Sequence, residues 1–394
     1  MIRNFFFKST TPSCRRSVEA FYPVLHMNLF SVFDIRSVMK FCIFLLGMCV
    51  VLWVECILGV GIELPEWMKR QIHRDLEQVS ELMDAKPQET MRSIHALQGG
   101  ELARLVLISI QNGKTSWETE GYVLDEEDYK RLDLFLEAID EAHALAPLPD
   151  IEFLVSLSDS YDRPLFLSKT YSPVFTLCKS TGNHKAVLIP SYFFYPETMH
   201  AYVPWEQKEE IALWRGGMTG EEYFFFEWDL KPRSRLVLLS KRYPEILNAY
   251  FVENNPAKHV GSYLASWLFM EGLLGEYMSP IEQSCFRYLI AVDGATTPRS
   301  MSWQLFSQSV LLKGASSRIE WFYGGLLPYV HYVEFDSEKE DVIEKIYQLQ
   351  KDENLALCIA QAAYSFAKTY LQKDYALSYL HTLLTTYDLY KNRK

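Results

Sequence analysis

The chain has 394 residues, a formal net charge of −11 and a hydrophobic content of 49%. This length is sufficient for two ordinary domains, and the composition supports a sizeable core and excludes an intrinsically disordered chain. The negative charge argues against nucleic acid as the main partner, because neutralising phosphates requires a basic face. It is still compatible with a local pocket in which a few arginines bind a phosphorylated ligand.

The N-terminal part divides into two segments. Residues 1–40 form an extension without a structural pattern, and residues 41–62 are apolar apart from Glu55. An apolar run of 22 residues is long enough to cross the hydrocarbon core of a bilayer. We therefore predict a transmembrane or signal-anchor helix at 41–62, which would attach the protein to a membrane. A signal peptide is the alternative, because Lys40 precedes the apolar run.

The side of the membrane depends on where translation begins. Basic residues before the apolar segment would hold the N-terminus in the cytoplasm. A start at Met39 would instead leave the basic residues after the segment dominant, and the larger part of the chain would then be cytoplasmic. Both orientations remain open.

The seven cysteines do not indicate a disulfide scaffold or a zinc site. Cys42, Cys49 and Cys56 recur every seven residues and would share one face of the apolar helix. There they would serve as small apolar filler, or as sites of S-acylation or of a dimer contact. The other cysteines lack CxxC spacing.

From residue 63 onward, hydrophobic periodicity indicates an N-terminal lobe at 63–204 and a C-terminal lobe at 205–394. In the first lobe we expect an amphipathic helix, a strand, a long helix and two more strands, at 66–82, 105–110, 125–146, 153–157 and 186–189. In the second lobe we expect two buried parallel strands and three amphipathic helices, at 289–292, 310–312, 338–350, 353–371 and 375–390. Two α/β lobes with a cleft between them are the natural architecture for this pattern.

Asp159 is the best candidate for a catalytic residue. It follows the buried run FLVSL, so its carboxylate should lie at the top of a strand and face the inter-lobe cleft. A general base at this place could take a proton from an acceptor hydroxyl. The alternative is a turn or helix-capping aspartate, because Ser158-Asp159-Ser160 is typical of a turn.

Two arginines flank a glycine loop in the second lobe. Arg215 and Arg233 lie on either side of a segment that contains Gly216, Gly217 and Thr219. The guanidinium fork donates two bonds to adjacent oxygens and therefore suits a pyrophosphate. A solvated arginine pair beside a structural glycine turn is the alternative.

Polar residues also follow the strand predicted at 289–292. Asp293, Gly294 and Arg299 offer a carboxylate, close backbone approach and a fixed positive charge. Because ligands bind at the carboxyl ends of strands in open α/β sheets, this combination favours a nucleotide with phosphates. GxGxxG, GxxxxGK[ST], HxxxH and HExxH are all missing, as is a DxD-type pair at a suitable strand end. Neither a dinucleotide site, a P-loop nor a metal is therefore expected.

Several ordered motifs make residues 150–390 similar to glycosyltransferase family 90. They are FLVSLSD, ALWRGGMTG, PRSRLVLLSKRYP, FRYLIAVDG, SWQLFSQSVLLK and EWFYGGLLPYVHYV. The last two motifs and the lack of a cysteine framework resemble the bacterial branch of this family most closely. The resemblance implies a GT-B-like fold of two facing Rossmann-type lobes, with the UDP-sugar bound by the C-terminal lobe and the acceptor on the N-terminal side.

The resemblance also assigns roles to residues. It implies that Asp159 is the base, that Gly217 and Arg233 contact the donor, and that Arg299 binds the diphosphate. The loop that holds the uridine diphosphate also includes three further residues, Ala295, Thr296 and Thr297. An aromatic segment, IPSYFFY, matches one that faces the sugar and the acceptor through Tyr192, Phe194 and Tyr195. Family tryptophans are replaced by the two tyrosines, so the choice of donor sugar is expected to differ.

The function expected from this resemblance is inverting, metal-independent transfer of a sugar, glucose or xylose, from a UDP-sugar. The acceptor would be a hydroxyl of a lipopolysaccharide, a capsule or another surface glycan, and the catalytic part would be cytoplasmic in a bacterium. Transfer to a protein hydroxyl is the alternative, as is a catalytically silent glycan-binding protein on the same fold. Apart from the UDP-sugar, which is a substrate, no cofactor is expected.

Overall fold

The computed structural model describes residues 62–190, 203–219, 227–252 and 257–393. The chain divides into the units Met1–Leu58 and Gly59–Lys394, and the description below concerns the second unit. The apolar helix predicted at 41–62 lies outside the described residues, apart from Ile62. The helices that the structure does describe include none that is long and apolar enough to cross a bilayer.

The first sheet contains strands in the order β2-β1-β3-β4-β6. Their bounds are β1 Leu105–Gln111, β2 Lys114–Glu118, β3 Ile151–Ser156, β4 Val174–Thr176 and β6 Ala186–Leu188. Strand β1 is antiparallel to both β2 and β3, whereas β3, β4 and β6 run parallel. The sheet is therefore mixed, and only its β3-β4-β6 part follows the parallel pattern expected of a Rossmann-type lobe.

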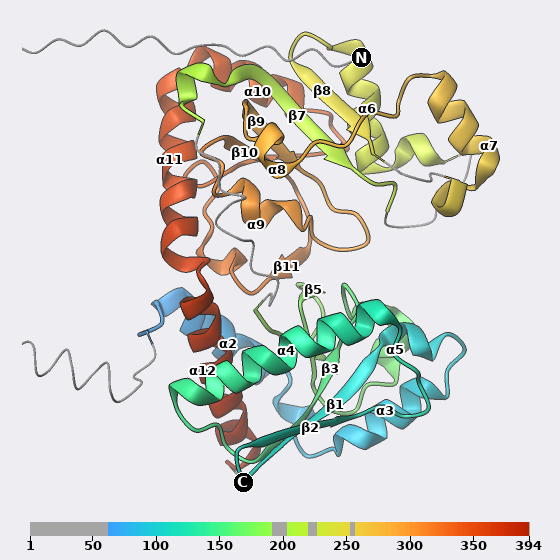
Figure 1. Ribbon diagram of the computed structural model, residues 1–394, viewed down its shortest axis with the longest axis vertical. Helices are drawn as coiled ribbons and strands as arrows, with labels where there is room; N and C mark the ends of the chain where they lie inside the picture. The colour runs from blue at the N-terminus through green and yellow to red at the C-terminus, as the bar shows by residue number, and fades with distance from the viewer. Residues whose placement is uncertain (1–61, 191–202, 220–226, 253–256, 394) are drawn as a thin grey trace, which may run out of the picture. The chain divides into compact units, whose positions relative to one another are not determined.

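The helices associated with this sheet come from both ends of the described chain. They are α2 Glu66–Gln78, α3 Pro87–His95, α4 Glu126–Leu145, α5 Pro164–Ser168 and α12 Lys373–Lys391. A capping box fixes the start of α4, where the Asp125 side chain accepts from the Asp128 backbone N–H and Asp128 reciprocates. Figure 1 shows α12 beside α4, although the two helices are far apart in the sequence.

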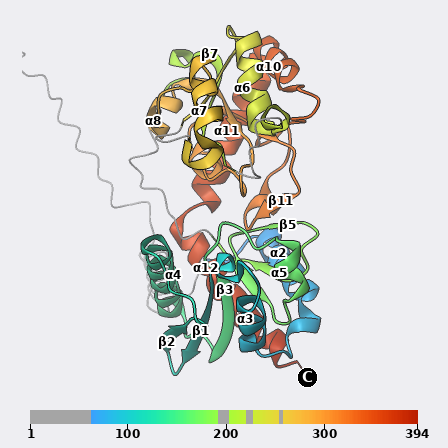
Figure 2. The same ribbon diagram turned by 90° about the vertical axis from the view of Figure 1, so that its right-hand side faces the viewer.

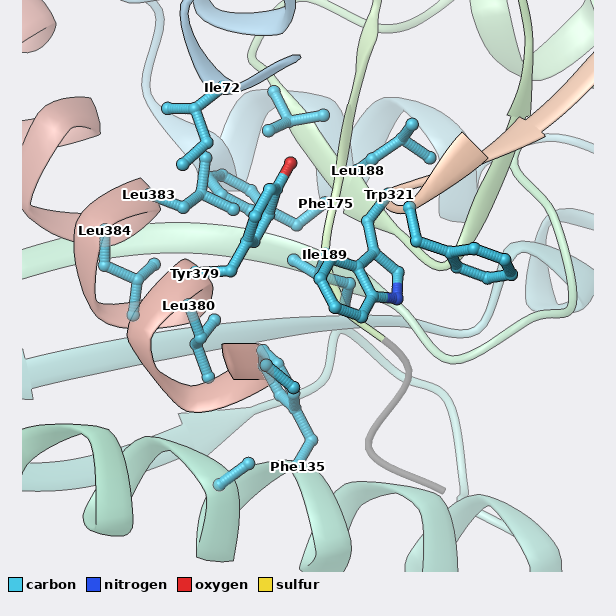
Figure 3. Close-up of a cluster of buried hydrophobic side chains, with 14 of the residues drawn as sticks. Ile72, Phe135, Phe175, Leu188, Ile189, Trp321, Tyr379, Leu380, Leu383 and Leu384 are labelled. Atoms are coloured by element: carbon cyan, nitrogen blue, oxygen red, sulfur yellow. The ribbon is translucent and has the colours of Figure 1, made fainter. Parts of the chain in front are cut away.

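Helix α12 completes the core of the first sheet. Figure 3 shows Tyr379, Leu380, Leu383 and Leu384 of this helix among buried side chains that include Phe135 of α4. Burying one such side chain contributes about 1.5–3 kcal/mol relative to leaving it exposed. The C-terminal helix therefore stabilises the N-terminal sheet, and residues from distant parts of the chain hold this part of the fold together.

The second sheet has the order β12-β10-β9-β7-β8 and is parallel throughout. Its strands are β7 Glu209–Gly216, β8 Leu247–Phe251, β9 Phe286–Ala291, β10 Val310–Gly314 and β12 Val333–Phe335. Strands β9 and β10 confirm the two buried parallel strands predicted from their apolar runs. In chain order the sheet reads 2-1-3-4-5, a doubly wound arrangement with a topological switch point between β7 and β9.

The remaining helices surround or follow this second sheet. They are α6 Pro232–Arg242, α7 Ala257–Met270, α8 Pro280–Gln283, α9 Ser300–Gln304, α10 Val342–Lys351 and α11 Glu353–Tyr370. Short 3₁₀ turns occur at Ser80–Leu82, Gly100–Ala103, Trp205–Gln207, Trp228–Leu230 and Tyr323–Gly325. The core of this half joins the buried faces of the sheet to residues of α6, α10 and α11.

A small antiparallel sheet connects the two halves. Strand β5 Cys178–Ser180 pairs with β11 Arg318–Glu320, and the two strands lie side by side in both views (Figures 1 and 2). The Thr181 N–H extends this pairing by donating to the Ser317 carbonyl at 2.8 Å. The loops after β4 and after β10 are thereby held together by backbone hydrogen bonds.

Candidate active site

Asp159 lies just beyond the carboxyl end of β3, as the sequence predicts. Its Oδ1 accepts hydrogen bonds from Arg131 of α4 at 2.9 Å and from Arg299 at 2.8 Å. Its backbone carbonyl accepts from the Thr296 hydroxyl at 3.1 Å. The side chain is 39% exposed, so the carboxylate is both anchored and open to solvent.

The electrostatic surroundings of Asp159 favour its charged form. Burial by itself raises the pKa of this carboxyl, but the charges of Arg299 and Arg131 and their hydrogen bonds outweigh that effect. The pKa of Asp159 consequently lies below its ordinary value, and the group is a carboxylate at neutral pH.

The segment that follows Asp159 is fixed by a second aspartate. The Asp162 carboxylate accepts hydrogen bonds from the backbone N–H and hydroxyl of Ser180 and from the Asn183 side chain, at 2.9–3.0 Å. The buried Tyr161 hydroxyl meets that of Thr170 at 2.8 Å. The segment that directly follows Asp159 is therefore anchored, which limits the positions that Asp159 can reach.

In the second sheet, the glycine loop and the loop after β9 leave adjacent strands at the topological switch point. Strand β7 leads into Gly217 and Thr219, and β9 leads into Asp293 and Gly294. In doubly wound sheets, this place is where ligands bind, because the loops separate and leave a crevice outside the strand ends. The tertiary structure thus brings together two segments that the sequence proposed separately.

Arg233 joins these two loops. Its guanidinium donates to the Gly217 carbonyl at 2.7 Å and to the Thr219 hydroxyl at 2.9 Å. It also donates to the carbonyls of Val292 at 3.1 Å and Asp293 at 3.0 Å. The sequence predicts that Arg233 contacts the donor. In this structure these four hydrogen bonds fix the two loops relative to each other.

The loop from Asp293 to Arg299 has further partners on β11. Arg318 of β11 donates to the Gly294 carbonyl at 2.9 Å, and Thr297 donates to Glu320 at 2.5 Å. Burial raises the pKa of Glu320 to about 7, and it also raises the pKa of Asp293. Of the two carboxyl groups with raised pKa values, Asp293 begins the loop that carries Arg299 and Glu320 accepts a hydrogen bond from that loop.

Arg215 occupies a different position from the other predicted donor ligands. Its guanidinium bonds to the Asn248 carbonyl at 3.0 Å and to the Asn248 side chain at 2.8 Å, and it lies over the Tyr250 ring. These partners belong to β8, so Arg215 supports the neighbouring strand. Its neighbour Gly216 has no room for a side chain, because an added Cβ would lie 2.5 Å from the Trp214 ring.

The structure gives no side-chain contact for the remaining predicted site residues. Ala295 is exposed in the loop after β9. Tyr192, Phe194 and Tyr195 lie outside the described residues, so their role beside the sugar stays a prediction. Among the residues that the structure describes, no group of three or more His, Cys, Asp or Glu side chains could hold a metal ion.

Sequence reasoning missed three residues of this site. Arg131, Arg318 and Glu320 come from α4 and β11, and they contact Asp159 and the loop after β9 only through the folded chain. The sequence carries one signal for them: Glu127 and Arg131 are four apart, a spacing that places both on one face of a helix. That signal identifies the helix face but does not show that Arg131 contacts Asp159.

Comparison with known proteins identifies the family. The model of glycosyl transferase family 90 matches residues 68–393. Protein O-glucosyltransferase 2 of Danio rerio is 31% identical over 255 residues, which is 61% of this chain and 47% of that protein. Protein O-glucosyltransferase 1 of Rattus norvegicus is 25% identical over 61% of this chain and 62% of its own length. The chain thus matches about half to two thirds of these relatives.

Solved structures give a more distant likeness. Anabaena HepE in complex with UDP-glucose is 12% identical with a TM-score of 0.39, covering 66% of this chain and 77% of that one. The family assignment rests instead on the family model, which spans both sheets and every residue of the candidate site described above. The chain belongs to glycosyltransferase family 90.

Proposed function

We propose that this protein is an inverting, metal-independent glycosyltransferase that moves glucose or xylose from a UDP-sugar to a hydroxyl group of a protein. Family membership supports sugar transfer, and the relatives named protein O-glucosyltransferases favour a protein acceptor. They favour it over the lipopolysaccharide or capsule acceptor that the sequence suggested first. Two facing lobes of the GT-B kind would present the donor and the acceptor to each other.

The contact between Asp159 and Arg299 carries this proposal. It brings the candidate base at the end of β3 within 2.8 Å of the candidate diphosphate ligand beyond β9. Displacement at an anomeric carbon needs a base on one side and stabilisation of the leaving group on the other. A carboxylate and a guanidinium contributed by different halves of the fold meet both needs.

The transfer step follows from these positions. Asp159 takes the proton of the acceptor hydroxyl while the hydroxyl oxygen attacks the anomeric carbon of the sugar. The bond from that carbon to the diphosphate oxygen breaks, and its electron pair leaves with UDP. Arg299 offsets the charge that grows on the diphosphate, and Arg233 holds the two loops that surround it. Attack from the face opposite UDP inverts the anomeric configuration.

A binding experiment on the full chain tests the donor class. We would measure the melting temperature with UDP, GDP, ADP and buffer alone. UDP at about 100 times its dissociation constant should add ~2.7 kcal/mol to the free energy of unfolding, which shifts the melting temperature. A shift with UDP alone supports the proposal, and equal responses to all three nucleotides contradict a UDP-specific site.

A transfer experiment tests the acceptor class. UDP-glucose and UDP-xylose would be offered with folded small protein domains, the same domains denatured, and lipopolysaccharide. Mass spectrometry that finds a hexose or a pentose on a protein hydroxyl supports the proposal. Transfer to lipopolysaccharide alone would restore the first sequence-based expectation, and UDP binding without any transfer would favour a catalytically silent protein.

A further inference from the structure

Arg131 is the more deeply buried of the two arginines that contact Asp159. Its side chain is 6% exposed, against 52% for Arg299. Its Nη1 donates to the Leu157 carbonyl at 2.8 Å and to Asp159 Oδ1 at 2.9 Å. Its Nε and Nη2 donate to Glu127 at 3.2 and 2.6 Å. Arg131 is therefore fixed by its own helix and by the end of β3.

Both arginines donate to the same oxygen of Asp159. In the described part of the chain, no hydrogen bond reaches the other oxygen, Oδ2. A carboxylate held through one oxygen has a defined rotation, and its second oxygen keeps the lone pairs that a general base needs. The two oxygens are thus distinguished before any substrate binds.

The two arginines differ in what can displace them. Arg299 belongs to the loop proposed to bind the diphosphate, whose negative charge competes with Asp159 for the guanidinium. Arg131 has no such competitor, because Glu127 and the Leu157 carbonyl hold it within α4 and β3. When the donor draws Arg299 away, Arg131 is the contact that remains on Asp159.

We propose that Arg131 is a positioning residue for sugar transfer: it holds Asp159 by Oδ1 and leaves Oδ2 to take the proton of the acceptor hydroxyl. The inference rests on the proposed function and adds a residue that acts through the base without touching the substrate. It accounts for an arginine with a buried side chain placed beside the end of β3.

The proposal predicts a change in the pH dependence of transfer. Two charged groups act on the Asp159 carboxylate: Arg131 from α4 and Arg299 from the segment before α9. Glu127 in turn pairs with Arg131. Removing the Arg131 charge removes one of the effects that lower the pKa of Asp159. The acidic limb of the profile of kcat/KM should therefore move to higher pH in an Arg131→Met variant.

The test compares Arg131→Met and Arg131→Lys with Arg104→Met as the matched control. Arg104 also pairs with an acidic residue of α4, Asp128, at 2.9 Å, but it has no recorded contact with Asp159. In Arg131→Met we expect kcat to fall about 10- to 100-fold, because misplacing a catalytic group by about 1 Å has such effects. We also expect an unchanged dissociation constant for UDP. In Arg131→Lys, which keeps the charge, the acidic limb should stay in place while kcat falls.

A double-mutant cycle separates this role from a purely structural one. In an Asp159→Asn background, Arg131→Met should have no further effect on residual transfer, because its partner is already lost. A wild-type kcat and pH profile in Arg131→Met would overturn the inference and leave the proposed function intact. Should Arg131→Met fail to fold, Arg131→Lys decides: wild-type kcat in that variant overturns the inference. Wild-type protein without any transfer activity would refute the proposed function instead.

Discussion

Arg299 and Asp159 are 140 positions apart in the chain, and a hydrogen bond of 2.8 Å joins Arg299 Nη2 to Asp159 Oδ1. The group proposed to bind the diphosphate thus neutralises the group proposed to act as base. If the donor draws Arg299 toward its phosphates, Asp159 loses one of its two cations and becomes a stronger base. Donor binding and base activation would then be coupled, and the coupling would be reciprocal.

Asp159→Asn should reduce transfer to a small residual rate and leave UDP binding intact or tighter. The amide cannot take the proton of the acceptor, and general-base catalysis contributes about 10²- to 10⁴-fold to the rate. The loss of the carboxylate also releases Arg299 for the diphosphate. Transfer measured with UDP-glucose, together with calorimetric titration of UDP, checks both parts. Undiminished turnover would exclude Asp159 as the base.

Arg299→Ala should weaken UDP binding about 10- to 100-fold, because a hydrogen bond to a charged group contributes about 1.5–3 kcal/mol. Arg242→Ala is the control: Arg242 forms an exposed ion pair with Glu340 at 2.7 Å and should keep the wild-type dissociation constant. Calorimetric titration of UDP into both variants provides the measurement. Equal affinity in wild type and Arg299→Ala would remove Arg299 from the donor site.

Gly294→Ala should weaken UDP binding by disturbing Arg233. An added Cβ would lie 2.5 Å from Arg233 Nη2 and 2.5 Å from the Thr219 hydroxyl, so the guanidinium would have to leave the two loops that it joins. We expect an affinity loss of about tenfold, the equivalent of one lost hydrogen bond. Gly182→Ala has open space around the new methyl group and is the matched control. A Gly294→Ala variant that binds UDP as Gly182→Ala does would show that Arg233 does not shape the donor site.

Glu320→Gln should change the pH dependence of stability. The pKa of Glu320 is raised from 4.5 to about 7, chiefly by burial, so the unfolded state releases this proton at lower pH than the folded state. Stability from this group is therefore complete below about pH 4.5 and is lost as the pH rises through about 7, with a slope of at most ~1.4 kcal/mol per pH unit. The variant lacks this pH-dependent contribution. The melting temperature of Glu320→Gln, measured relative to that of the wild type, should therefore rise with pH over the same interval.

Melting curves of wild type and Glu320→Gln between pH 5 and pH 8 check this prediction. Glu334→Gln, at an exposed position of β12 in the second sheet, is the control and should follow the wild-type curve. Parallel curves for wild type and Glu320→Gln would mean that Glu320 does not carry a raised pKa.

Most of the elements that the sequence predicted are present in the structure, which also contains helices and strands that were not predicted. The helix predicted at 125–146 is α4 Glu126–Leu145, and the run at 153–157 contains most of β3. Both carry strong local signals: a capping aspartate before an apolar period in one, and a continuous buried run in the other. Local sequence was sufficient to predict these two segments, because propensity, capping and burial all favour the same structure.

Other elements depended on contacts that no local pattern displays. The helix predicted at 338–350 begins at Val342, since Asp336 and Asp341 bind backbone N–H groups of the preceding turn. The hairpin between β1 and β2 was not predicted, although Asn112 and Gly113 between the two strands form a dipeptide that is typical of a hairpin turn. The first sheet is mixed because β1 runs antiparallel to both β2 and β3.

The sequence by itself determined the α/β class, the order of the elements that it predicted and the types of side chain available for chemistry. It placed an aspartate after β3 and an arginine after β9, because polar residues that directly follow buried runs mark strand ends. Only the tertiary structure decided which groups meet: Arg131 with Asp159, Thr297 with Glu320, and Arg233 with two loops at once. The physical reason is that charge and hydrogen bonding act over a few ångströms in space, and chain separation does not limit which residues the packed sheets and helices bring that close.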